Sequence, residues 1–136
     1  MIARGPLGPG ALARRAGGSL VAASVVAVAA LAGCTSDGGG EGTVIEVSST
    51  DDACELSAAT APPGPVTFAV TNDGTRITEF YLYAADGTEV VGEVEDIGPS
   101  TSRDLTVELE AGDYVSACKP GMEGDGLRAD FLVADA

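Results

Sequence analysis

Four side chains of this 136-residue chain have the chemistry to bind a metal ion: Cys54, Glu79, Glu93 and Cys118. Thiolates are soft ligands that suit copper or zinc, whereas carboxylates suit harder ions such as ferric iron, manganese or calcium. The chain contains no histidine, so the commonest metal-binding side chain is absent. Any metal centre must therefore use other groups, and these four residues are the candidate ligands.

Two motifs resemble the metal-binding segments of cupredoxins, which are small β-sandwich copper proteins. One is Gly-x-Tyr-x3-Cys-x-Pro, from Gly112 to Pro120, and the other ends in Glu-Phe, from Asn72 to Phe80. Cupredoxins carry a histidine ligand at the positions that are Gly121 and Thr78 here. A blue-copper centre needs two imidazoles and a thiolate, so this chain cannot build one. Met122 is interpreted as a loop residue rather than an axial ligand.

The cysteines allow two interpretations. Cys54 and Cys118 form an even pair in an exported chain, which favours a structural disulfide. Such a bond would stabilise the fold by about 4 kcal/mol in the chain-entropy model. Alternatively, both thiolates are metal ligands. The two interpretations exclude each other in any one redox state.

An ordered set of motifs resembles the cupredoxin-like domain of the EfeO family of iron uptake components. The resemblance covers about residues 43–134 and rests on the segments DDACE, APPGPVTFAVTNDG, TRITEF, VVGEVEDIGP, ELEAGDY and ACKPG. It implies a role in iron or copper acquisition, a cysteine pair at Cys54 and Cys118, and acidic residues at Glu79, Glu93 and Glu95. The family's usual form continues into a helical M75-like domain, so this chain resembles a free-standing version of the first domain. Expected partners are an iron-uptake permease or an M75-like lipoprotein.

Glu79, Glu93 and Glu95 are the carboxylates that could contribute to a metal site. Glu79 follows the position of the first missing histidine, and the loop at Cys118 is expected to close beside it. Glu93 and Glu95 are predicted to point to one face, because strand side chains alternate with a period of two. With bonded cysteines, this set favours a hard ion; with free thiolates, it favours copper or zinc.

The N-terminal region is typical of a processed export signal. Arg4, Arg14 and Arg15 precede an apolar run from 20 to 32 that is too short for the roughly 20 residues of a membrane-spanning helix. The run ends in Leu-Ala-Gly-Cys34, which resembles a lipobox. We therefore predict a lipoprotein signal peptide at 1–33, a lipidated Cys34, and a flexible tether over 34–42. The expected location is the outer face of the cytoplasmic membrane.

The remainder of the chain is strongly acidic. After Cys34 it has 21 acidic and four basic residues, a net charge of −17. A surface of that charge repels phosphates and attracts cations or basic partners. The charge therefore excludes nucleic acid as a partner.

The pattern from residue 43 to residue 136 predicts an all-β fold. Val66, Phe68 and Val70 alternate with less apolar residues, as expected for a half-buried strand. Asp86 and Gly87 predict a hairpin turn. A Greek-key β-sandwich of the cupredoxin-like type fits this pattern. Seven to eight strands are expected, near residues 43–49, 54–58, 66–71, 78–84, 88–94, 103–109, 112–118 and 128–134.

Two functional hypotheses follow. No catalytic constellation is present, so an enzyme is not expected. The favoured hypothesis is a membrane-anchored metal-binding lipoprotein linked to iron or copper acquisition. The alternative is a metal-free, disulfide-stabilised domain that docks on a permease or a partner lipoprotein.

Overall fold

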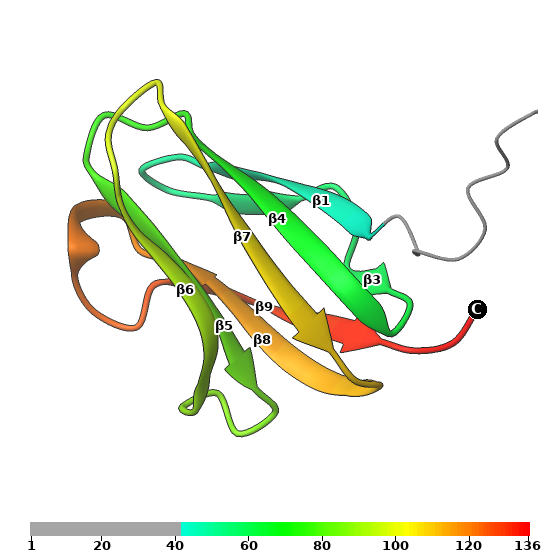
Figure 1. Ribbon diagram of the computed structural model, residues 1–136. Coiled ribbons are helices and arrows are strands. Elements are labelled where there is room, and N and C mark those ends of the chain that lie inside the picture. Colours follow the sequence, from blue (N-terminus) through cyan, green and yellow to red (C-terminus); the bar gives the residue numbers. More distant parts are fainter. Residues whose placement is uncertain (1–41) are drawn as a thin grey trace, which may run out of the picture. The chain divides into compact units, whose positions relative to one another are not determined.

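The computed structural model describes residues 42–136, which form two β-sheets packed face to face (Figure 1). One sheet has the strand order β2-β1-β4-β7, and the other has the order β3-β9-β8-β5-β6. The elements are β1 (Thr43–Ser49), β2 (Cys54–Leu56), β3 (Thr60–Ala61), β4 (Gly64–Asn72), β5 (Thr78–Ala84), β6 (Val90–Ile97), β7 (Ser102–Leu109), β8 (Gly112–Cys118), the 3-10 turn η1 (Pro120–Met122) and β9 (Leu127–Val133).

The expected sandwich is confirmed, and the nine strands of the described region include all eight predicted segments. The additional strand, β3, pairs in parallel with β9. It has only two residues, which is too short for the alternation of apolar and polar residues to be recognised in the sequence. The predicted leader at 1–33 and Cys34 lie outside the described residues. Within residues 42–136, no helix has the length and apolar character needed to cross a membrane.

The core lies between the two sheets and is centred on three phenylalanines. Phe68 of β4 contacts Phe80 of β5 and Phe131 of β9, with ring centroids 5.1 and 5.2 Å apart. All three are almost completely buried. Aromatic pairs at this spacing add to the stabilisation from burial, so these residues connect the two sheets at their centre.

Strand β5 is buried on both faces. Phe80 and Leu82 point into the core, while Tyr81 and Tyr83 form a second cluster with Ala117 on the outer face of the same sheet. This arrangement follows from the alternation of side chains along a strand. The outer face of the β3-β9-β8-β5-β6 sheet therefore carries its own aromatic layer.

The hairpin between β5 and β6 forms where it was predicted. Gly87 has a φ of 70°, a left-handed conformation that glycine adopts without strain. The Asp86 carboxylate accepts hydrogen bonds from the backbone of Glu89 and Thr88 and from the Thr88 hydroxyl. These bonds lower the pKa of Asp86 and fix the turn.

Strand β6 departs most from its prediction: it ends at Ile97 rather than near residue 94. The register shifts between the pairs Thr78–Ile97 and Phe80–Val94, so that Glu79 stands opposite two residues, Glu95 and Asp96. This is a β-bulge, which changes the direction of nearby side chains. Asp96 has a φ of 57°, and the strand continues through the bulge beyond its predicted end.

Candidate functional site

Cys54 and Cys118 form a disulfide, with their Cα atoms 5.5 Å apart. Cys54 belongs to β2 and Cys118 to β8, so the bond joins the two sheets. Cys118 is completely buried in the core. The disulfide interpretation is therefore confirmed, and in this state neither sulfur is a thiolate ligand.

A second link between the sheets lies at the position of the first missing histidine. The hydroxyl oxygen of Thr78 is 2.9 Å from that of Ser49, and both residues are completely buried. Ser49 is paired in β1 with Cys54, so this hydrogen bond lies close to the disulfide in the fold. The position of the first missing histidine is therefore occupied by two buried hydroxyl groups that are hydrogen-bonded to each other.

The position of the second missing histidine lies beneath a guanidinium group. Gly121 has a φ of 80°, and a Cβ atom added to it would lie 3.0 Å from Nη1 of Arg76. Arg76 is held by Asp51: its Nε lies 3.5 Å from the carboxylate, and its Nη2 donates to the Asp51 carbonyl. Met122, which follows Gly121, is 44% exposed. The Arg76 guanidinium lies at the position of the second missing histidine, and the Cys118 sulfur is bonded to Cys54. A copper centre would need an imidazole and a thiolate at these two positions, so these residues do not fit a copper centre.

The predicted ligands are divided between the two faces of one sheet. Cys118 points into the core, whereas Glu79 shares the outer face with Tyr81 because side chains alternate along β5. The loop after Cys118 does close beside Glu79, since the backbone N–H of Lys119 donates to the Glu79 carbonyl at 2.8 Å. The structure therefore brings Glu79 close to Glu93 and Glu95, but not to the sulfur atoms of Cys54 and Cys118. Metal binding by the glutamates remains a prediction.

The bulge in β6 gathers carboxylates at this outer face. Glu79 is only 8% exposed. No hydrogen bond among residues 42–136 reaches its carboxylate, and since no side-chain oxygen of these residues is both fully buried and without a partner, that carboxylate is in contact with solvent. The Glu95 carboxylate accepts a hydrogen bond from Tyr81. Glu95 and Asp96 both stand opposite Glu79 across the bulge. The bulge therefore concentrates acidic residues at one end of the β5–β6 pair.

Tyr81 lies among the carboxylates of Glu79, Glu93 and Glu95, and the sequence did not indicate it as a site residue. Its hydroxyl donates a hydrogen bond of 2.9 Å to Oε1 of Glu95, and its backbone is paired with Glu93. Burial, that hydrogen bond and the negative charge of Glu79 raise the pKa of the Tyr81 phenol well above its usual range. The alternation in Thr-Glu-Phe-Tyr-Leu-Tyr could have indicated it, because Glu79 and Tyr81 are two residues apart. We call Glu79, Tyr81, Glu93 and Glu95 the acidic face.

Two cations border the acidic face. The ammonium group of Lys119 lies 4.1 Å from the centroid of the Tyr81 ring, and the Arg128 guanidinium lies 4.7 Å from that of Tyr83. The two tyrosine rings are stacked, 5.6 Å apart with an interplanar angle of 8°. Both cations lie over the rings, where the π electrons attract them, and not at the phenol oxygen of Tyr81.

The carboxylates of the acidic face are neighbours without forming a closed coordination shell. Among residues 42–136, no three His, Cys, Asp or Glu side chains are arranged so that they could hold a metal ion. In chemical type, however, the donors of this face are oxygens that suit a hard ion.

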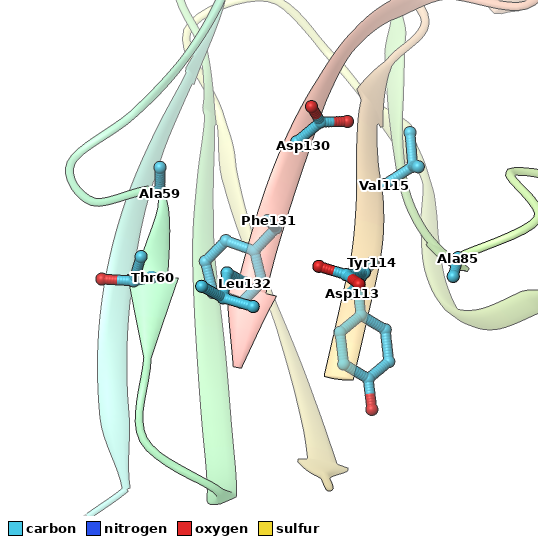
Figure 2. A pocket seen from close by; sticks show the side chains of 9 residues that line it. All are labelled: Ala59, Thr60, Ala85, Asp113, Tyr114, Val115, Asp130, Phe131 and Leu132. Carbon is cyan, nitrogen blue, oxygen red and sulfur yellow. The ribbon is translucent and has the colours of Figure 1, made fainter. Parts of the chain in front are cut away.

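A separate hollow of about 420 Å³ lies over β8, β9 and β3. Figure 2 shows Asp130 and Leu132 on β9, Asp113 and Val115 on β8, and Thr60 on β3. Leu132 is 42% exposed. The hollow therefore combines apolar surface with two carboxylates, and it contains none of the predicted ligands.

Comparison with known proteins supports the fold assignment. A family model described as "Cupredoxin-like domain" matches residues 21–133. Iron uptake system component EfeO from Yersinia pseudotuberculosis serotype I is 32% identical over 74 residues, which is 54% of this chain and 19% of that protein. The match to EfeO from Yersinia pestis has the same extent. The chain thus spans about a fifth of the length of these relatives.

Three solved structures share the fold. Reduced auracyanin from Roseiflexus castenholzii has a TM-score of 0.54 at 20% identity, and auracyanin A, a "blue" copper protein from Chloroflexus aurantiacus, has 0.52 at 16%. An azurin from Methylomonas sp. strain J has a TM-score of 0.52 at 12% identity. Each match covers 68% of this chain and 98% of the other. At these identities the likeness concerns the fold alone.

Proposed function

The chain belongs to the cupredoxin-like domain family, and from that premise we propose that it is a lipid-anchored accessory protein of iron acquisition that binds ferric iron as its cargo. The cargo site is the acidic face, with Glu79, Glu93 and Glu95 as oxygen donors. The cysteines have a structural role, because Cys54 and Cys118 are bonded to each other.

The observation that carries this proposal is the position of Glu79. The residue is only 8% exposed, its carboxylate accepts no hydrogen bond from the described residues, and Glu95 and Asp96 stand opposite it in the register of the bulge. A trivalent cation at this point would neutralise the repulsion between the carboxylates.

The family likeness and the predicted export signal support this role. The matched relatives are iron uptake components by name, although the match covers only part of their length. The leader and Cys34 would hold the domain at the outer face of the cytoplasmic membrane. There it could pass its cargo to a permease or to an M75-like lipoprotein of an iron uptake system.

One observation favours a second function, a metal-free docking domain. The hollow over β8 and β9 combines Leu132 and Val115 with the carboxylates of Asp113 and Asp130. Apolar surface with convergent charged groups is typical of binding sites. The net charge of −17 after Cys34 favours a basic partner there.

The two functions are separated by an iron titration. The mature chain, residues 34–136 with Cys34→Ser, is titrated with ferric nitrilotriacetate, and binding is followed by calorimetry. We expect micromolar or tighter affinity, which Glu79→Gln should weaken by about tenfold or more. Glu108→Gln is the matched control, because Glu108 is an exposed glutamate on β7 of the other sheet. A flat titration would exclude the cargo function and leave the docking function.

A further inference from the structure

We propose that the hollow over β8, β9 and β3 binds an extended segment of a basic partner protein, with lysine or arginine side chains at alternate positions of that segment. This inference rests on the docking function proposed above and deepens it, and it does not depend on iron. Its support is the pattern of side chains across two strands, the lack of an ion pair at the two carboxylates of the hollow, and the charge of the chain.

Four outward side chains of β8 and β9 form a diagonal pattern. Asp113 is paired with Leu132, and Val115 is paired with Asp130, so each carboxylate stands opposite an apolar side chain. The two carboxylates therefore lie on one diagonal of the strand pair, and the two apolar side chains lie on the other. Figure 2 shows these four residues on the two strands that line the hollow.

The spacing of the carboxylates matches that of an extended peptide. Diagonal neighbours in an antiparallel strand pair are about 7–8 Å apart, and alternate residues of an extended chain are separated by roughly 6.6 Å. Two basic side chains at alternate positions would therefore reach Asp113 and Asp130 from one side of the segment. Their aliphatic stems would pack on Leu132 and Val115, because long basic side chains bury their methylene groups along apolar surface while the charge stays in water.

The cations of the chain itself do not neutralise these carboxylates. Among residues 42–136, the one ion pair involves Arg76 and lies in other loops. Arg128 is two residues from Asp130 on β9, but its guanidinium donates to the Gly87 carbonyl at 2.7 Å and lies over a tyrosine ring. Asp113 and Asp130 are exposed, so their charges are available to a partner.

The charge of the chain favours a partner protein over two other occupants. A second copy would bring another net charge of −17 after Cys34, so the two surfaces would repel each other. The predicted tether after Cys34 has the sequence TSDGGGEG, with two acidic residues and no basic residue. A basic segment of another protein is the occupant whose charge complements the hollow, and complementary charge speeds association and favours the correct partner.

The test is an NMR titration of the mature chain, residues 34–136 with Cys34→Ser, with two synthetic peptides of equal composition. One is Ala-Ser-Lys-Ser-Lys-Ser-Ala, and in the other, Ala-Ser-Lys-Lys-Ser-Ser-Ala, the lysines are adjacent. The alternating peptide should shift the backbone amide signals of residues 113–115 and 130–132, with about millimolar affinity at low ionic strength. The adjacent peptide should bind about threefold or more weakly, because only one lysine reaches a carboxylate.

Two double variants with the same change in net charge test the site itself. Asp113→Asn/Asp130→Asn removes both carboxylates of the hollow with little change in shape, and should weaken binding of the alternating peptide about fivefold or more. Asp104→Asn/Glu108→Gln is the matched control, because it removes two exposed charges from β7 of the other sheet. The control should keep the affinity within about twofold.

The outcomes distinguish this inference from the function on which it rests. An equal loss of affinity in both double variants would indicate attraction by net charge alone, and equal affinity for the two peptides would exclude the alternating segment; either result overturns the inference. Signal shifts confined to another surface would also overturn it, but would leave the docking function. If neither peptide shifted any signal, the basic partner of the docking function would itself be excluded.

Discussion

The side chains of Glu79 and Cys118 lie on opposite faces of one sheet, although their strands β5 and β8 are hydrogen-bonded neighbours. The sulfur of Cys118 is in the core and bonded to Cys54. The carboxylate of Glu79 is on the acidic face. The disulfide and the proposed cargo site therefore lie on different sides of the sheet, so we expect that stability and metal binding can be changed separately by mutation.

Removing the disulfide should destabilise the fold without changing iron binding. In Cys54→Ala/Cys118→Ala, the free energy of unfolding should fall by about 4 kcal/mol, because the bond closes a loop between cysteines 64 residues apart. Urea unfolding measures the loss, and a ferric titration of the folded variant measures binding. If iron affinity also fell about tenfold, the separation of the two faces would be wrong.

Restoring the missing histidines should not restore a blue-copper centre. Thr78→His/Gly121→His supplies two imidazoles, but the Cys118 sulfur remains bonded to Cys54 and is not a thiolate. The variant should show no intense visible band with Cu(II). It should also be less stable by roughly 1–3 kcal/mol, because a larger side chain replaces the buried Thr78 and leaves Ser49 without its partner. A strong blue colour under oxidising conditions would contradict the prediction.

Removing the cation over Tyr81 should strengthen iron binding. The Lys119 ammonium lies 4.1 Å from the Tyr81 ring centroid, so it repels an incoming cation. We expect Lys119→Met to raise the ferric affinity by about fivefold at low ionic strength, and less at high salt. Arg103→Met, a change on β7 of the other sheet, is the control. Weaker binding in Lys119→Met would indicate that the ammonium positions the ring and does not oppose the ion.

The stability of the metal-free domain should fall in strongly alkaline solution. Because the pKa of Tyr81 is raised in the folded state, the fold favours the neutral phenol. This contribution is complete below the ordinary tyrosine pKa of about 10 and is lost as the pH rises toward the higher pKa of the folded state. Urea unfolding at a series of pH values above neutrality measures the slope. Tyr81→Phe should reduce the slope, and an unchanged slope would show that another group is responsible.

Local patterns were sufficient to predict most of the fold. The alternation around Phe68 predicted β4, the Asp86–Gly87 pair predicted the hairpin, and the absence of histidine excluded a blue-copper centre. These features depend on residues close together in the chain, where the period of two is visible. The disulfide was the favoured of two alternatives, because an exported chain indicates an oxidising compartment but the sequence does not fix the redox state of one cysteine pair.

The acidic face could be predicted only in part. The strand was predicted near residues 88–94, so the bulge at Glu95 and Asp96 was not anticipated. The face to which Glu79 points depends on its register relative to Cys118, two residues that are 39 positions apart. Tyr81 was missed because a tyrosine in an apolar strand resembles a core residue, and only tertiary structure shows its contact with Glu95.

The two links between the sheets, Cys54–Cys118 and Ser49–Thr78, have a thermodynamic consequence. Many small metal proteins fold only when their ion is present, so that losing the ion means unfolding. Here neither link involves an ion. We therefore expect the domain to keep its fold when no ion is bound. If the proposed cargo binds, loading and unloading would then be reversible steps between two folded states.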